Sequence, residues 1–98
     1  MAFWLAMAPA AEAAQAYPNP WRSGRDSSIP VTFAGFSGPA EIKIYTIAAE
    51  HVKTIQTSGS SAAWDLTNEA GERIASGVYL AAVRSAEGKS VLKLAVIR

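Results

Sequence analysis

The sequence predicts an all-β domain, a seven-stranded antiparallel β-sandwich of the immunoglobulin type. Short apolar segments with a two-residue period alternate with turns rich in Gly, Pro, Ser and Asn about every ten residues, which is typical of such a sandwich. The longest strand candidates, 77–84 and 90–97, are joined by a short turn at 86–88 and form a predicted β-hairpin. Helical periodicity is absent after residue 16, so no helical layer is expected.

Composition places the chain among small globular domains. Its 98 residues are 50% hydrophobic and 17% charged, which suits one domain rather than a disordered segment. A formal net charge of +1, with basic and acidic residues interspersed, gives no electrostatic footprint for nucleic acid. The absence of cysteine excludes disulfides and thiolate metal sites, and no apolar run is long enough to span a bilayer. We therefore expect no cofactor, no metal and no transmembrane segment.

The first sixteen residues differ in character from the rest. Residues 2–8 are apolar, and A-x-A patterns at 11–13 and 14–16 resemble a signal-peptide cleavage site, although no Lys or Arg precedes them. Either a signal-like segment or a linker after a preceding domain accounts for this composition. We therefore divide the chain into an unstructured or short helical extension, 1–16, and an immunoglobulin-like domain, 17–98.

Alternation of apolar residues predicts the strands that precede the hairpin. They span 17–22, 29–34, 40–46, 51–56 and 60–66. The first contains two prolines and is expected as an extended lead-in at an edge, and Ile29 of the second is expected to be buried. The apolar residues of 51–56 are three apart, which predicts a bulge near Lys53 and Thr54 in an edge strand.

Both hairpin strands are apolar on their two faces, so we expect them to be central in the sheet and buried on both sides. Trp64 is expected to be the largest side chain of the core. The expected core comprises Phe33, Ile42, Ile44, Trp64, Val78, Leu80, Leu94 and Val96.

Candidate catalytic and metal-binding residues are few. The one histidine, His51, lies in a surface-type strand with no apparent nucleophile, which argues against an enzyme. Acidic residues and an asparagine gather at 65–72, but their spacing departs from that of a calcium loop and is typical of a hydrophilic turn. Tyr79 is expected to pack at a sheet corner with its hydroxyl on the backbone, whereas Lys93 either faces solvent or serves recognition.

Several short motifs, taken in order, resemble a known family. They are Tyr17-Pro18-Asn19-Pro20, Ile42-Lys43-Ile44-Tyr45, Trp64-Asp65, Gly71, Ser76-Gly77-Val78-Tyr79 and the terminal Lys93-Leu94-Ala95-Val96-Ile97-Arg98. Their order and spacing over 17–98 look like the C-terminal type A sorting domain of type IX secretion cargo. That domain is in turn similar to the immunoglobulin-like domain of the flagellar hook-capping protein. Two positions where the family usually has glycine carry Ala49 and Leu66 instead.

The resemblance implies a function as well as a fold. In that family the domain is a C-terminal tag recognised by the secretion machinery. Carried over by motif, the recognition positions are Tyr17, Pro18, Asn19, Pro20, Gly77, Tyr79 and Lys93. The expectation is a non-enzymatic sorting or anchoring module of a secreted bacterial protein, with a protein partner and a location at the cell surface or outside the cell, reached through the periplasm. The alternative is an assembly or adhesion module. Neither involves nucleic acid or a small-molecule substrate.

Overall fold

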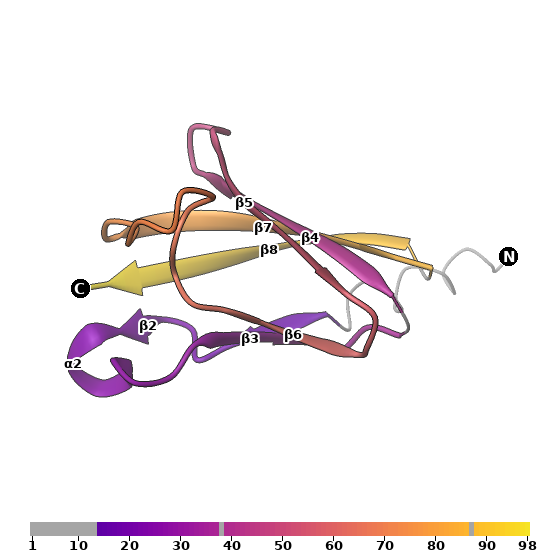
Figure 1. Ribbon diagram of the computed structural model, residues 1–98, viewed down its shortest axis with the longest axis horizontal. Helices are drawn as coiled ribbons and strands as arrows, with labels where there is room; N and C mark the ends of the chain where they lie inside the picture. The colour runs from indigo at the N-terminus through magenta and orange to yellow at the C-terminus, as the bar shows by residue number, and fades with distance from the viewer. Residues whose placement is uncertain (1–13, 38, 87) are drawn as a thin grey trace, which may run out of the picture.

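The structure, a computed structural model, describes residues 14–98 except Gly38 and Glu87. Figure 1 shows that these residues form two facing layers of strands. The described part contains eight strands and one short helix. The elements are β1 Gln15–Tyr17, β2 Trp21–Arg22, α2 Ser23–Asp26, β3 Val31–Ala34, β4 Ala40–Thr46, β5 His51–Thr57, β6 Ser61–Trp64, β7 Gly77–Ser85 and β8 Gly88–Ile97.

The extension expected at 1–16 falls largely on residues 1–13, which lie outside the described residues. Ala14, however, is buried, and Gln15 and Ala16 already pair with β3 in β1. The sheet therefore includes residues that precede the expected boundary at Tyr17. Among the described residues, no helix is long and apolar enough to cross a membrane.

The strands form one sheet in the order β1-β3-β6 and a second in the order β2-β8-β7-β4-β5. Neighbouring strands are antiparallel except β2 and β8, which run parallel, with Trp21 opposite Val96. The expectation of seven strands, all antiparallel, is thus wrong, although the all-β class and the two layers are found. The physical reason is that the chain leaves the first sheet after Tyr17 and joins the second at Trp21, so the predicted lead-in becomes a strand beside β8.

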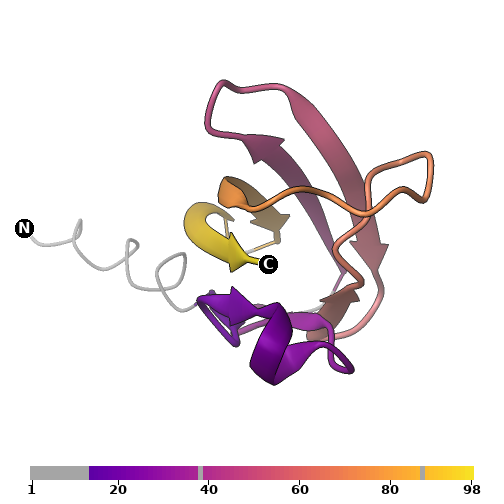
Figure 2. The same cartoon turned by 90° about the vertical axis from the view of Figure 1, so that its left-hand side faces the viewer.

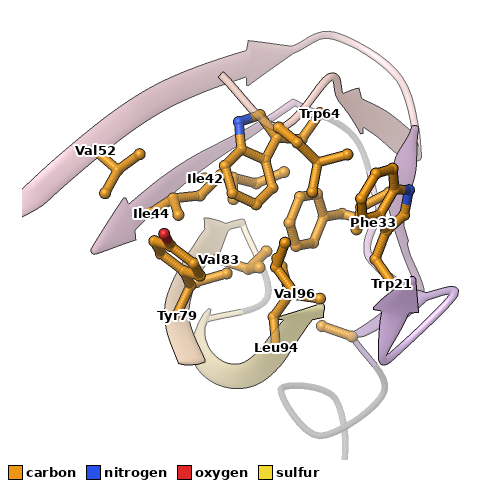
Figure 3. Close-up of a cluster of buried hydrophobic side chains, with 14 of the residues drawn as sticks. Trp21, Phe33, Ile42, Ile44, Val52, Trp64, Tyr79, Val83, Leu94 and Val96 are labelled. Atoms are coloured by element: carbon orange, nitrogen blue, oxygen red, sulfur yellow. The ribbon is translucent and has the colours of Figure 1, made fainter. Parts of the chain in front are cut away.

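The core fills the space between the two sheets, as Figure 3 shows for Trp64, Phe33 and their neighbours. Six of the expected core residues are buried there: Phe33, Ile42, Ile44, Trp64, Leu94 and Val96. The other two were expected wrongly, because Val78 is 39% exposed and Leu80 is half-buried on the outer face of β7. Strand alternation turns Tyr79, Ala81 and Val83 toward the core instead. Both faces of β7 are apolar, but only one faces the other sheet.

Two expectations about strand edges also need correction. Ile29 is 47% exposed because β3 begins only at Val31, after Pro30. The bulge in the β4–β5 pair leaves Val52 as the extra residue, since Ile44 pairs with Lys53 and Tyr45 with His51. It therefore lies one residue earlier than predicted. β5 is an edge strand, as expected.

The connection between β6 and β7 covers part of the edge of β5. The Glu69 backbone N–H donates to the carbonyl of Val52 at 3.0 Å, and the Glu69 carboxylate accepts the Thr54 N–H at 2.8 Å. Ile74, within the same connection, is buried. Strand addition at this position of β5 is therefore blocked, because two of its main-chain groups already have partners.

Candidate recognition site on the last strand

Asn19 joins the motif at the start of the domain to the last strand. Its Nδ2 donates to the Lys93 carbonyl at 2.9 Å, and its Oδ1 accepts the Ala95 N–H at 3.1 Å. A side-chain amide carries one donor and one acceptor group, as a peptide does, so Asn19 supplies the bonds that a neighbouring strand would make. The two flanking residues are prolines, and both X-Pro bonds, Tyr17-Pro18 and Asn19-Pro20, are cis.

The C-terminal end of β8 is held by its pairing with β2 and by the contacts of Arg98. Trp21 of β2 is buried, and its indole N–H donates to the Ile29 carbonyl at 2.9 Å. The Arg98 guanidinium lies 5.3 Å from the centre of the Trp21 ring, and its Nε donates to the Ile74 carbonyl at 2.6 Å. A cation over an indole face is attracted by the ring quadrupole. These contacts fix the end of β8 near α2, at the same end of the sandwich in Figure 2.

Between the expected strands 17–22 and 29–34 lies the short helix α2, which was not expected from the sequence. Asp26 is 5% exposed and forms an ion pair with Arg25 at 2.9 Å. Arg25 Nη2 also donates to the Pro20 carbonyl, and the Arg22 N–H donates to the Asp26 carboxylate. The hydrogen bonds from Arg25, with that from Arg22, hold the pKa of Asp26 below its ordinary value. This network ties α2 to the residues just after Asn19.

Tyr79 has the structural role expected of it. Its side chain is buried, and its hydroxyl donates to the Ala75 carbonyl at 2.7 Å, four residues upstream. Its ring meets Trp64 edge to face, with centroids 6.0 Å apart. Burial raises the pKa of the phenol. Tyr79 therefore fixes the start of β7 with its side chain in the core.

Lys93 is exposed on the outer face of the five-stranded sheet, opposite Leu80 of β7. Its own carbonyl is the group that Asn19 binds, so the structure brings these two motif positions together. Gly77 lies on β7 opposite Val96, where a Cβ would meet only Tyr79 Cε1 at 3.8 Å. That contact is ordinary, so local space does not demand glycine there. Tyr17 is 50% exposed and pairs with Thr32 of β3.

The residues considered for chemistry take structural positions. His51 Nε2 lies 2.7 Å from Thr54 Oγ1, and its ring meets Tyr45 edge to face. In the acidic turn, Asn68 Oδ1 accepts the N–H groups of Ala70 and Glu72, which is local turn chemistry. Within 14–98, apart from the two omitted positions, no group of three His, Asp or Glu side chains is placed to hold a metal ion.

Sequence reasoning missed the charged residues that surround this strand. Arg84 of β7 and Lys89 of β8 are directly opposite each other, and Lys43 of β4 is paired with Ala82 on the same outer face. The short hairpin turn at 86–88 could have revealed the Arg84–Lys89 pair, because the turn sets which residues face each other across the two strands. No sequence pattern indicated the role of Arg25 and Asp26, because that role depends on the hydrogen bond from Arg25 to the Pro20 carbonyl.

No protein-family model matches the sequence, and no curated protein does. Among solved structures, the chain is similar to PorZ, an essential bacterial surface component of the type IX secretion system of Porphyromonas gingivalis. The TM-score is 0.78 with 27% identity, over 95% of this chain and 12% of PorZ. Dimeric latent PorU from the same organism matches with a TM-score of 0.60 and 24% identity, over 86% of this chain and 9% of PorU.

The chain spans about an eighth of PorZ and less of PorU, so the likeness concerns one region of each. That region is their C-terminal part of about 90 residues. PorU, at its lower identity, supports the fold alone. The described chain therefore has the structure of the C-terminal region of these type IX secretion proteins, consistent with the resemblance to a type IX C-terminal domain.

Proposed function

We propose that this domain is a non-enzymatic sorting or anchoring module of a secreted bacterial protein, recognised at β8 by a type IX secretion or surface-attachment machinery. The observation that carries the proposal is the state of the last strand. β8 is fastened at Lys93 and Ala95 by Asn19, yet the Lys93 side chain is exposed on a domain similar to a region of a type IX surface component.

A fastened strand with an exposed side chain is suited to recognition. Asn19 and β2 hold the C-terminal half of β8 in one position, so little conformational entropy is lost when a partner binds it. The N-terminal half, from Gly88 to Leu92, has no strand partner on its outer side among the described residues. A partner protein therefore meets both an exposed lysine on a fastened strand and main-chain groups that no described strand pairs with.

The same proposal covers location. A module of this kind accompanies its protein through the periplasm to the cell surface or the medium, in keeping with the likeness to a bacterial surface component. The partner is a protein of the secretion or attachment machinery. Nucleic acid, a small-molecule substrate and a cofactor have no part in this function.

The test is a secretion assay in a bacterium with a type IX system, with the full chain fused to the C-terminus of a periplasm-targeted fluorescent protein. We expect delivery to the surface or medium. Delivery should be lost in Lys93→Ala and kept in Lys53→Ala, a lysine on the opposite edge strand β5. Retention of a folded wild-type fusion in the periplasm, or equal loss in the two variants, contradicts the proposal.

Gly77→Ala gives a second test of the motif positions. Because a Cβ there makes only an ordinary contact, the variant should keep its stability and its fold. Loss of export with unchanged stability would then identify Gly77 as part of the recognised surface. Unchanged export would make it a family feature without a recognition role in this chain.

A second candidate, an assembly or adhesion module like the hook-capping domain, is favoured by one observation. The outer face of the β7–β8 hairpin exposes Val78, Val91 and Ile97, at 39%, 60% and 42%. Exposed apolar side chains grouped on one sheet face are typical of surfaces that bind another protein. Sedimentation of the purified chain separates the two: concentration-dependent self-association that Val91→Lys abolishes supports assembly, whereas a monomer at all concentrations supports sorting.

A further inference from the structure

The outer face of the five-stranded sheet concentrates positive charge. Strand alternation places Lys43, Arg84, Lys89 and Lys93 on it, with Glu41 as the one acid among the described residues of that face. Glu41 is bonded to the Gln56 amide at 3.4 Å, and the one salt bridge in the described part of the chain is the distant Arg25–Asp26 pair. The whole chain has a net charge of only +1, so this concentration is local.

Two of these cations face each other directly. Arg84 and Lys89 are cross-strand partners, and like charges in that relationship destabilise a sheet. Beside them lies a recess of about 90 Å³, lined by Glu41, Lys43, Tyr45, Ala82, Arg84 and Lys89. Since about 10–15 Å³ of such volume holds one water molecule, the recess is large enough for a small polar group such as a carboxylate. An anionic group placed there would relieve the repulsion.

The free edge of β8 lies next to these cations. Asn19 binds the Lys93 carbonyl and the Ala95 N–H, so the odd-numbered residues of β8 direct their main-chain groups away from β7. By the same alternation, Lys89 and Val91 direct theirs to the outer edge, where no described strand pairs with them. Their side chains are on the outer face, and Val91 is 60% exposed.

We propose that the partner of β8 is an extended protein segment with an acidic, an apolar and an acidic residue at alternate positions, which adds as a strand along Lys89 and Val91 and places its second acid beside the side chain of Lys93, whose carbonyl Asn19 already binds. This inference rests on the proposed function and gives the chemistry of the partner at the same strand. The segment's main chain bonds to the free edge, its acids lie beside the two lysines, and its apolar residue covers Val91. Arg84 and Lys43 add to the positive field beside Lys89.

An extended peptide fits these observations better than a free anion. The free N–H and C=O groups of β8 recur every second residue, which is the spacing of a neighbouring strand. Lys89, Val91 and Lys93 have the same two-residue spacing, so charged and apolar side chains alternate along this edge. Lysines on exposed edges can also serve to prevent strand pairing, and the experiment separates that role from recognition.

The experiment titrates three peptides of equal length into the full chain. One has Glu, Val and Glu at alternate positions, the second has the same composition with the acids moved by one residue, and the third has Lys in place of Glu. Backbone amide shifts report the site. We expect the first peptide alone to shift Lys89 and Val91, with an affinity that falls as salt is raised.

Charge reversal supplies the control. In the double variant Lys89→Glu and Lys93→Glu, the first peptide should bind about tenfold more weakly and the lysine peptide should gain affinity, because each charge pair reverses sign. Lys53→Glu, on β5, should leave both affinities unchanged. Equal binding of the two acidic peptides would overturn the proposal, since register would then be irrelevant. Absence of binding, with self-association of a Lys89→Val and Lys93→Val variant, would overturn it in favour of lysines that protect the edge.

Export measured on the same variants distinguishes failure of the inference from failure of the proposed function. If export needs Lys93 but the acidic peptide does not bind, the partner has another chemistry and sorting stands. If the peptide binds in register but the folded fusion is not exported, the strand recognises an acidic segment outside a sorting function.

Discussion

The amide of Asn19 is paired with the main chain of Lys93, 74 residues away in sequence, through an Nδ2 to carbonyl hydrogen bond of 2.9 Å. With the Ala95 N–H on its Oδ1, this side chain acts as one peptide unit of an additional strand. It therefore explains physically why the motif at the start of the domain and the motif at its end occur together.

The contact between Asn19 and β8 predicts how two substitutions of Asn19 change the stability of the domain. Asn19→Ala should lower the free energy of unfolding by about 1 kcal/mol, because two exposed hydrogen bonds are lost. Asn19→Asp should lower the free energy of unfolding by at least as much at neutral pH, because a carboxylate then faces the Lys93 carbonyl and cannot donate to it. The loss of stability should be smaller in acid, where the protonated carboxyl group donates to that carbonyl. Urea unfolding at pH 7 and pH 3 measures both, and an aspartate variant that is insensitive to pH relative to wild type would contradict this geometry.

The buried phenol of Tyr79 should make the stability of the domain fall at alkaline pH. Tyr79→Phe should lower the free energy of unfolding by about 1 kcal/mol, because the hydrogen bond to the Ala75 carbonyl is lost while the ring contacts remain. Burial raises the pKa of Tyr79 above its ordinary value, so the neutral phenol is favoured in the folded state. Its contribution is present below the unfolded pKa and is lost as pH rises through the folded pKa. The phenylalanine variant should lack this loss in thermal unfolding followed from pH 8 to pH 12.

Asp26 predicts the acid limit. Its pKa is lowered by hydrogen bonds from Arg25 and Arg22, so its contribution is present above the unfolded pKa and is lost as pH falls through the folded pKa. Asp26→Asn should therefore lower the melting temperature at pH 7, and the difference from wild type should narrow as the pH falls below about 4. Glu50→Gln, an exposed turn residue, is the control. A difference that is constant with pH would show that the charge of Asp26 does not matter.

The sequence predicts well where one face alone is apolar. In β4 the alternation identifies Ile42 and Ile44 as core residues, and both are fully buried. In β7 both faces are apolar, but Val78 and Leu80 would be buried only if a further layer of structure packed on the outer face of the sheet. The periodicity of a single strand does not show whether such a layer exists.

The candidate recognition site, too, could be predicted only in part from the sequence. The motif positions come from the resemblance, but the Asn19–Lys93 contact joins residues too distant for any local pattern to reveal. The helix α2 has four residues, fewer than a periodic signal needs, and it depends on the Arg25 contact with the Pro20 carbonyl. Only the cross-strand pair Arg84 and Lys89 was within reach of sequence reasoning, through the short hairpin turn.

Substitution by glycine should have opposite effects on stability at Ala49 and at Leu66, the two positions where the family usually has glycine. Ala49 has φ 70° and Leu66 has φ 64°, a left-handed conformation that costs a residue with a Cβ about 1 kcal/mol. Ala49 is exposed, so Ala49→Gly should raise stability by about 0.5 kcal/mol, after the greater freedom of glycine in the unfolded chain is subtracted. Leu66 is 3% exposed, so Leu66→Gly should lower stability by about 2–4 kcal/mol, because the cavity outweighs the relief of strain.

Chemical unfolding of the two glycine variants measures these changes, and Ala48→Gly is the matched control for the first. Ala48 is exposed in the same turn without a positive φ, so glycine there should only destabilise. A stabilising Ala48→Gly, or a destabilising Ala49→Gly, would show that the turn is not held as described. If Ala49→Gly stabilises the domain, glycine at this family position is explained by backbone conformation, and contact with the secretion machinery is not needed to account for it.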